Sequence, residues 1–318
     1  MSLDTADAQE SIDGEVWNRL DTIRRNKRLR WLTYLFGLGL IAIAFYMTYT
    51  TVGFSVTKLV AYWPEFSSAL GEYFPTTTVF GIPMLDFGRY WEFIVEEDLF
   101  QLSIVTISMA FTGTLLGLPG ALIMGTLGSE RVTPFPFNFL FRMTMSIIRA
   151  IPALVWALIF IPLGGVTAFT GTLAIAVDTM GYLGRLFTDE LEEIDDGPVE
   201  GIRSTGADKD QTVYFGMLSQ VIRQYIAWGM YIFELNVRIA ITLGLIGAGG
   251  LGFVMNMQRQ TFQYTNMMAA ILVSVVLILT IEMASQRIRS HLREDEDTMS
   301  FVEILQSFPS KTREAFAR

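Results

Sequence analysis

The sequence predicts an all-α, polytopic membrane protein with about six transmembrane helices. Hydrophobic residues make up 51% of the 318 residues, and the mean hydropathy is +0.41. A soluble domain of this length rarely reaches such values, because it must cover its surface with polar groups. The apolar residues also form separate blocks of about 20, the length that crosses the hydrocarbon core as a helix.

The N-terminal part predicts one span with its leading end in the cytoplasm. Residues 1–30 are polar, lack the apolar core of a signal peptide and are interpreted as a loose amphipathic helix at most. They end in the basic run RRNKRLR, directly before apolar residues 31–52, the first predicted span. A basic cluster holds its end of a span inside the cell. Residues 53–98, aromatic and interrupted by prolines, are interpreted as an external loop with short interfacial helices.

Residues 99–290 form the core domain and contain the other predicted spans. In chain order these spans are about 100–127, 139–163 with a kink at Pro152, 166–187, 223–247 and 267–283. Small residues in the second span permit close helix packing, namely Gly113, Gly117, Gly120 and Gly125. The polar tail 291–318 follows a basic flank, so both termini are expected to be cytoplasmic.

The polar loop 188–222 carries signals for two short helices joined by a tight turn. Asp196 or Gly197 is expected to cap the first helix, with Pro198 at its first position, and Gly206 to end it in a left-handed conformation. Asp208 and Gln211 predict a capping box on the second helix. An ordinary solvated loop is the alternative, but a helix-turn-helix between spans favours a docking element.

Three separated stretches carry a family resemblance. They are IRAIPALVWALIF (148–160), TMGYLGRLFTDELEEIDDGPVEGIRSTGA (179–207) and FELNVRIAITLGLIGAGGLGF (233–253). In this order, and with the surrounding region 101–289, they resemble the phosphonate-type permeases of ABC importers. Glu200, Gly201 and Gly206 stand where that family's cytoplasmic signature loop has its Glu-Ala pair and glycine.

The resemblance implies the type I ABC importer permease fold and a set of partners. It implies a pair of permeases, as a homodimer or with a paralogue, two separate ATPase subunits and an extracellular substrate-binding protein. The ATPases would dock on the coupling loop, our name for residues 188–222. The residues expected to carry that coupling are Pro198, Glu200, Gly201, Arg203 and Gly206. The implied substrates are phosphonate, phosphate or phosphite, with ATP bound by the partner subunits and no cofactor in this chain.

The sequence departs from the family pattern at several positions. Gly201 replaces the alanine of the signature pair, and the usual Leu-Pro pair of the loop is Leu218-Ser219. Asp178 stands where histidine is expected, and Ala153 where glutamate is expected. The changes in the loop are compatible with docking, whereas those within the spans bear on the substrate.

The run GAGGLG (247–252) matches the dinucleotide-binding pattern GxGxxG only literally. A dinucleotide fold needs this pattern after a strand and before a helix, and here it follows a predicted span. By the resemblance it belongs to a gate or re-entrant turn near the outer face, with Gly247, Gly249 and Gly250 as its expected residues. The chain contains no GxxxxGK[ST] phosphate-cradling loop.

Ionisable residues within the spans form the second candidate site. Such residues are costly in lipid and usually face a cavity or a partner. Glu234 and Arg238 are four residues apart and are expected to pair on one helix face. The pair is either purely structural or, with Arg149, helps an anion through a path that Asp178 and Asn236 shape.

Composition excludes several other classes. The chain has no cysteine and a single histidine, His291, so thiolate metal sites and Ser-His-Asp triads are not expected. The net charge of −9 disfavours nucleic-acid binding. Acidic residues gather in both tails, as solvated tails or as an adaptation to a high-salt, halophilic cytoplasm. We therefore predict a transport subunit rather than an enzyme. The alternatives are a permease for another solute, such as methionine, and a non-transporting scaffold or sensor.

Overall fold

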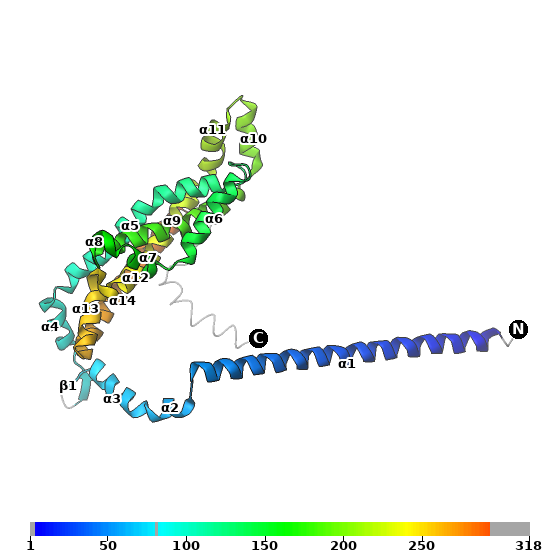
Figure 1. Cartoon of the computed structure of the whole chain (residues 1–318), viewed down its shortest axis with the longest axis horizontal. Helices are drawn as coiled ribbons and strands as arrows, with labels where there is room; N and C mark the ends of the chain where they lie inside the picture. Colours follow the sequence, from blue (N-terminus) through cyan, green and yellow to red (C-terminus); the bar gives the residue numbers. More distant parts are fainter. Residues whose placement is uncertain (1–3, 80–81, 293–318) are drawn as a thin grey trace. The chain divides into compact units, whose positions relative to one another are not determined.

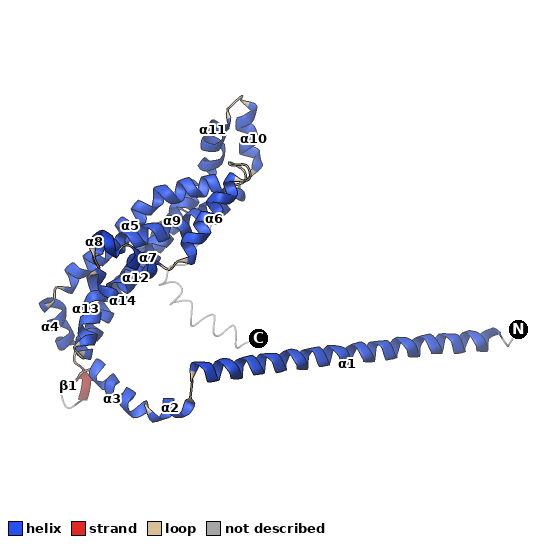
Figure 2. Cartoon of the chain, viewed as in Figure 1, coloured by secondary structure: helices blue, strands red, loops and turns tan. Residues whose placement is uncertain are grey.

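The described part of the protein is helical apart from one small hairpin. A computed structural model describes residues 4–79 and 82–292 (Figures 1 and 2). The chain divides into two compact units, Met1–Ser68 and Ala69–Arg318. The all-α prediction is confirmed. The acidic residues 294–297 of the C-terminal tail lie outside the described residues.

The first unit is dominated by one long helix. α1 (Asp4–Val52) runs for 49 residues without interruption and ends where Gly53 adopts a φ of 66°. The polar N-terminal segment, expected to be a loose helix at most, is therefore continuous with the first span. No proline lies between Asp4 and Val52, so nothing in the backbone stops the helix. Its apolar part, Leu29–Val52, packs against nothing in its own unit, as a lipid-facing helix would.

Residues 53–98 contain the predicted short helices and a hairpin that the sequence analysis did not predict. The elements are α2 (Val56–Ala61), α3 (Trp63–Tyr73), β1 (Thr76–Val79), β2 (Ile82–Leu85) and α4 (Phe87–Glu96). β1 and β2 pair antiparallel, with Thr76 opposite Leu85. The run TTTV is β-branched throughout and suits a strand. The Tyr90 hydroxyl of α4 donates to the Tyr73 carbonyl oxygen at 2.5 Å, which ties α4 to the end of α3.

The second unit is a helix bundle. Its main helices are α5 (Leu99–Gly128), α6 (Phe137–Ala150), α7 (Ala153–Ile159), α8 (Ile161–Gly164), α9 (Ala168–Glu192), α12 (Ser219–Leu243), α13 (Gly250–Gln260) and α14 (Tyr264–Leu292). Between α9 and α12 lie α10 (Asp196–Ser204), α11 (Lys209–Gln211) and the π-helical turn Thr212–Leu218. A second π-helical turn, Gly244–Ala248, joins α12 to α13.

The number of apolar spans is lower than the six predicted. Within the described residues, four helical segments are long and apolar enough to cross a membrane: Leu29–Val52, Leu99–Gly128, Lys209–Ala248 and Tyr264–Ser290. A fifth is the pair α6 and α7, bent by 89° at the predicted Pro152 kink. The remaining predicted span corresponds to α9, which does not meet the apolar criterion. Because α9 lies among α5, α6, α7 and α12, most of it faces protein rather than lipid and tolerates polar residues.

Close contact between α5 and α9 depends on the predicted glycines. A Cβ at Gly113 would lie 2.6 Å from the Ile175 side chain, and one at Gly125 would lie 2.7 Å from a backbone oxygen of α9. Such distances are shorter than van der Waals contact, so only glycine permits this approach. The prediction of small-residue packing is thus confirmed.

The coupling loop and the glycine-rich link lie toward opposite ends of the bundle. Figure 1 shows α10 and α11 projecting from one end and α4 and α13 at the opposite end. A buried cluster that includes Phe187, Leu191, Val199 and Val221 anchors the first end. A second cluster, which includes Phe93, Leu99 and Leu251, holds the opposite end together.

Candidate functional site

The coupling loop has the predicted helix-turn-helix form. The turn residue Gly206 has a φ of 85°, as the sequence predicted. On the second helix, the Gln211 amide donates to Asp208 Oδ1 at 2.8 Å and the Asp208 amide donates to Gln211 Oε1 at 3.2 Å. The predicted capping box is therefore confirmed.

The start of α10 corrects one prediction. The N-cap is Asp195, which has extended backbone angles, and the helix begins at Asp196 rather than at Pro198. Pro198 is the third residue of the helix. It is still tolerated there, because amides of the first turn have no partner within the helix.

One face of α10 packs against the bundle, and the other face exposes charged residues. Val199 is buried in the cluster at this end of the bundle, whereas Glu200, Gly201 and Arg203 are exposed. Arg131, in the turn between α5 and α6, donates to Asp196 Oδ1 at 2.7 Å. This ion pair, which sequence reasoning missed, couples the position of α10 to the turn between α5 and α6.

A second ion pair lies at the same end of the bundle. Arg142 of α6 forms an ion pair with Glu192 at the end of α9, and its Nε donates to the Gly128 carbonyl oxygen at 2.7 Å. Glu192 also accepts from the Glu130 amide at 3.1 Å. Nothing in the sequence pairs Arg142 with Glu192, 50 residues away.

The second candidate site is a cavity of about 490 Å³ between α7, α9 and α12, with a mostly apolar lining that includes a few polar and charged side chains; we call it the polar cavity. Three of the predicted residues line it: Asp178, Asn236 and Arg238. Arg149 does not line it, but its guanidinium lies 4.9 Å from the ring centroid of Tyr182, which does. The structure therefore brings the predicted ionisable residues of three segments to one place.

Asn236 fixes the geometry of this cavity. It is 1% exposed, and its Nδ2 donates to Thr114 Oγ1 of α5 at 2.8 Å and to Thr179 Oγ1 of α9 at 2.9 Å. A buried amide that bridges two neighbouring helices orients all three, because breaking either hydrogen bond leaves a polar group unpaired. Asn236 is thus a structural element of the cavity wall as well as part of its lining.

The predicted pair Glu234–Arg238 exists, but it belongs to a larger ion cluster. Arg238 donates to Glu234 at 3.0 Å and to Glu282 of α14 at 3.1 Å, and Arg289 donates to the second oxygen of Glu234 at 3.2 Å. Sequence reasoning missed Glu282 and Arg289. A carboxylate in the last apolar span was an available signal for Glu282, since intramembrane charges require a partner.

The glycine-rich link adopts backbone conformations that favour glycine. Gly247, Gly249 and Gly250 have φ values of 109°, 97° and 67°. A Cβ at Gly250 would overlap Thr106, whose Oγ1 accepts from the Leu251 amide at 3.0 Å. The run follows helix α12 and not a strand, so the dinucleotide interpretation is excluded.

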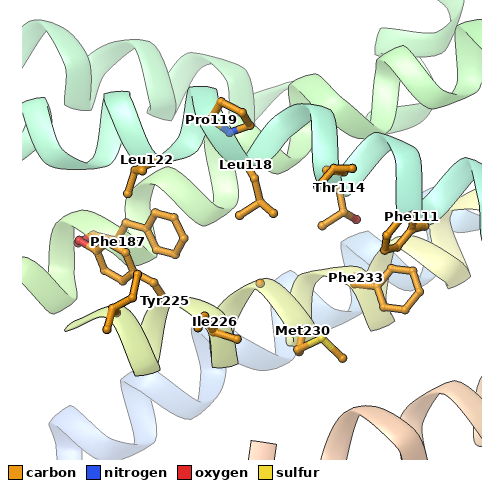
Figure 3. A pocket seen from close by; sticks show the side chains of 13 residues that line it. Phe111, Thr114, Leu118, Pro119, Leu122, Phe187, Tyr225, Ile226, Met230 and Phe233 are labelled. Atoms are coloured by element: carbon orange, nitrogen blue, oxygen red, sulfur yellow. The ribbon is translucent and has the colours of Figure 1, made fainter. Parts of the chain in front are cut away.

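A larger cavity, of about 560 Å³, is almost wholly apolar (Figure 3). It lies between α5 and α12, and aromatic side chains such as Phe111, Phe187 and Phe233 line it. The hydroxyl of Tyr225 donates to the Phe187 carbonyl oxygen at 2.8 Å. Because no charged side chain lines this cavity, it is unsuited to a charged ligand.

Comparison with known proteins gives consistent results. Residues 117–293 match the family described as binding-protein-dependent transport system inner membrane component. The chain is 32% identical over 196 residues to the phosphate-import permease protein PhnE of Mycolicibacterium smegmatis. This match covers 61% of this chain and 37% of PhnE. It is 29% identical over 189 residues to the phosphite transport system permease protein PtxC of Stutzerimonas stutzeri. This match covers 59% of this chain and 69% of PtxC.

A solved structure shares the fold. An inward-facing structure of the MetNI methionine ABC transporter matches with a TM-score of 0.55 and 20% identity, covering 62% of this chain and 96% of that chain. The architecture is therefore that of type I ABC importer permeases, and the protein is a multi-pass membrane protein. Because the family match extends over more than half of the sequence, the chain belongs to the family of binding-protein-dependent transport system inner membrane components.

Proposed function

We propose that this chain is the permease subunit of an ATP-driven importer for oxyanions of the phosphonate, phosphate and phosphite type. The observation that carries the proposal is the similarity to PhnE and PtxC, whose names specify phosphate import and phosphite transport. The polar cavity agrees with it, since Arg238 supplies a guanidinium, the group best suited to a tetrahedral oxyanion.

Two permease chains, as a homodimer or with a paralogue, would form the path across the membrane. Two ATPase subunits would dock on the coupling loops, at the exposed face of α10 that carries Glu200, Gly201 and Arg203. An extracellular binding protein would deliver the substrate, and both termini would lie in the cytoplasm. Closure of the ATPases would move α10 and, through the Arg131–Asp196 pair, the helices beneath it, giving alternating access by rigid-body movement.

The glycine-rich link has a separate role in this proposal. Gly247, Gly249 and Gly250 lie next to α13, at the end of the bundle opposite to the coupling loop. A link with three positive φ angles permits a sharp change of direction without a long loop. We assign it to the outer gate.

The test is reconstitution with the ATPase and the binding protein encoded beside this chain. Phosphite, methylphosphonate, phosphate and methionine are supplied in turn, and uptake into vesicles and ATP hydrolysis are measured. We expect uptake of at least one of the three oxyanions. Uptake of methionine alone would assign the chain to another solute. If no ATPase co-purifies and nothing is transported, the chain is a scaffold or sensor.

A further inference from the structure

Asp178 is a buried carboxylate without a partner in the described part of the chain. It is 5% exposed and lines the polar cavity, yet among residues 4–79 and 82–292 it forms no ion pair or side-chain hydrogen bond. An ionised carboxylate inside a membrane protein is costly unless another charge or donor compensates it. Asp178 is not a member of the ion cluster. A group that compensates its charge would therefore have to bind in the cavity.

The facing charge is Arg238, which has donors to spare. Both of its hydrogen bonds, to Glu234 and to Glu282, use Nη2. Its Nε and Nη1 have no partner among the described residues, and the side chain is 39% exposed. Each remaining N–H of a guanidinium can donate a charge-assisted hydrogen bond to an oxygen of a carboxylate, phosphate or phosphonate. Arg238 can therefore hold an oxyanion while it remains in the ion cluster.

The charges beside the cavity suit a ligand that carries both signs. The cluster behind Arg238 contains two guanidiniums, Arg238 and Arg289, and two carboxylates, Glu234 and Glu282, so its charges cancel. Asp178 adds a negative charge to the lining, and Arg149 adds a positive charge beside the lining residue Tyr182. An oxyanion can therefore enter, but it leaves the Asp178 carboxylate without a partner. A ligand that also carries a positive group meets attraction at both ends.

The acceptors for such a group are present. Asn236 uses Nδ2 for Thr114 and Thr179, so its amide oxygen accepts from none of the described residues. An ammonium group has three N–H donors and needs acceptors such as a carboxylate and an amide oxygen. The cavity volume, about 490 Å³, falls in the usual range for small-molecule sites.

We propose that Asp178 is a specificity-determining residue that binds the ammonium group of a zwitterionic substrate whose oxyanion end binds Arg238. The shared chemistry is an ammonium and an oxyanion in one small molecule, which an aminoalkylphosphonate or an α-amino acid supplies. The proposal rests on the proposed function, because it assumes that substrate passes through this cavity. It goes further in assigning a site for a positive group, which favours zwitterionic substrates over bare oxyanions.

The test compares matched substrates on the complete reconstituted transporter. Aminomethylphosphonate and methylphosphonate differ in the ammonium group, and methionine represents the α-amino acids. Uptake of each is measured for the wild type, for Asp178→Asn and for Asp178→Glu, which keeps the charge. Glu92→Gln removes an exposed carboxylate of α4, outside both the cavity and the coupling loop, and is the matched control. The binding protein is the same throughout, so a change in the ratio of two uptake rates reports on the permease.

We expect Asp178→Asn to lower uptake of the ammonium-bearing substrate at least about tenfold relative to methylphosphonate, the size of a lost charge-assisted hydrogen bond. Asp178→Glu should retain most of the preference, and Glu92→Gln all of it. Selective loss of aminomethylphosphonate or of methionine supports the proposal and identifies the source of the ammonium.

An unchanged uptake ratio in Asp178→Asn, with bare oxyanions transported normally, overturns the inference and leaves the proposed function intact. Methionine uptake that depends on Asp178, without transport of any oxyanion, supports the inference and overturns the proposed function. If Asp178→Asn does not assemble, the wild type and Asp178→Glu are compared instead. If neither takes up the ammonium-bearing substrate in preference to methylphosphonate, the inference is also overturned.

Discussion

Arg131 and Asp196 connect two segments that lie 65 residues apart, with Arg131 Nη1 2.7 Å from Asp196 Oδ1. The arginine belongs to the turn between α5 and α6, and the aspartate is the first residue of α10. Their pairing links a movement of the coupling loop directly to the turn between α5 and α6.

Reversal of this pair tests that link. Arg131→Asp should reduce uptake per ATP hydrolysed, and the swapped double variant with Asp196→Arg should recover part of it. Stability should change by at most about 1 kcal/mol, because both side chains are partly exposed, at 29% and 75%. Thermal unfolding in detergent separates the two effects. Equal loss in the single and the swapped variant would contradict a role for the pairing itself.

The turn at Gly206 is expected to be essential for ATPase coupling. Gly206→Val places a β-branched residue at a φ of 85°, which it strongly resists, and should misdirect α10 against α11. We expect weaker ATPase binding and loss of substrate-stimulated ATP hydrolysis, with the permease dimer still assembling. Glu200→Lys should act similarly by reversing the exposed charge.

The matched control for Gly206→Val is Gly201→Ala. A Cβ at Gly201 meets nothing within 4 Å, and the position is helical. Alanine should therefore stabilise α10 by up to about 1 kcal/mol without blocking coupling. Normal ATPase binding and uptake in both Gly206→Val and Glu200→Lys would reduce the coupling loop to a simple connection.

The ion cluster predicts non-additive stability changes. Arg238→Ala leaves Glu234 with Arg289, so we expect a loss of about 1–3 kcal/mol. Removing both arginines leaves the buried Glu234 unpaired, which should cost about 3–5 kcal/mol. Chemical unfolding of the two single variants and the double variant measures the difference. A double variant no less stable than either single variant would contradict the cluster.

Uptake distinguishes a structural role of Arg238 from a role in the path. If Arg238 binds the oxyanion, transport falls in Arg238→Ala even where the transporter assembles. Lys should rescue it poorly, because an ammonium lacks the planar pair of donors. Full uptake by a stable Arg238→Ala transporter excludes it from the path and leaves the structural role.

Both termini are expected in the cytoplasm. The chain has no native cysteine, so single cysteines at positions 7 and 297 can be labelled without background. A membrane-impermeant thiol reagent should reach neither position in intact cells and both after permeabilisation. Labelling of either position from outside would contradict the predicted orientation.

The acidic composition predicts a response to salt. With a net charge of −9 concentrated outside the apolar blocks, the purified protein should unfold at a higher temperature in multimolar KCl than in dilute buffer. Salt screens the repulsion between like charges. Identical unfolding temperatures would leave the acidic tails as ordinary solvated segments and refute the halophilic interpretation.

The sequence by itself determined the features that depend on local chemistry. Long apolar blocks, the kink at Pro152, the positive φ at Gly206 and the capping box of Asp208 with Gln211 all follow from residue type and short spacing. The family resemblance also lies in contiguous stretches, so it is visible without a structure. Helix boundaries were less well predicted, as at Asp196, because several neighbouring residues are competent caps.

Only the tertiary structure decided which distant residues meet. Arg131 with Asp196, Arg142 with Glu192, and Glu234 with Arg289 join segments whose neighbours no local pattern specifies. The status of α9 was decided in the same way, since a helix enclosed by protein does not need the apolar surface that reveals a lipid-facing span. Asp178 was recognisable as a charge within a span. That it faces a cavity, and lacks a partner among the described residues, follows from the packing of α7, α9 and α12 around it, because burial depends on how separate helices come together.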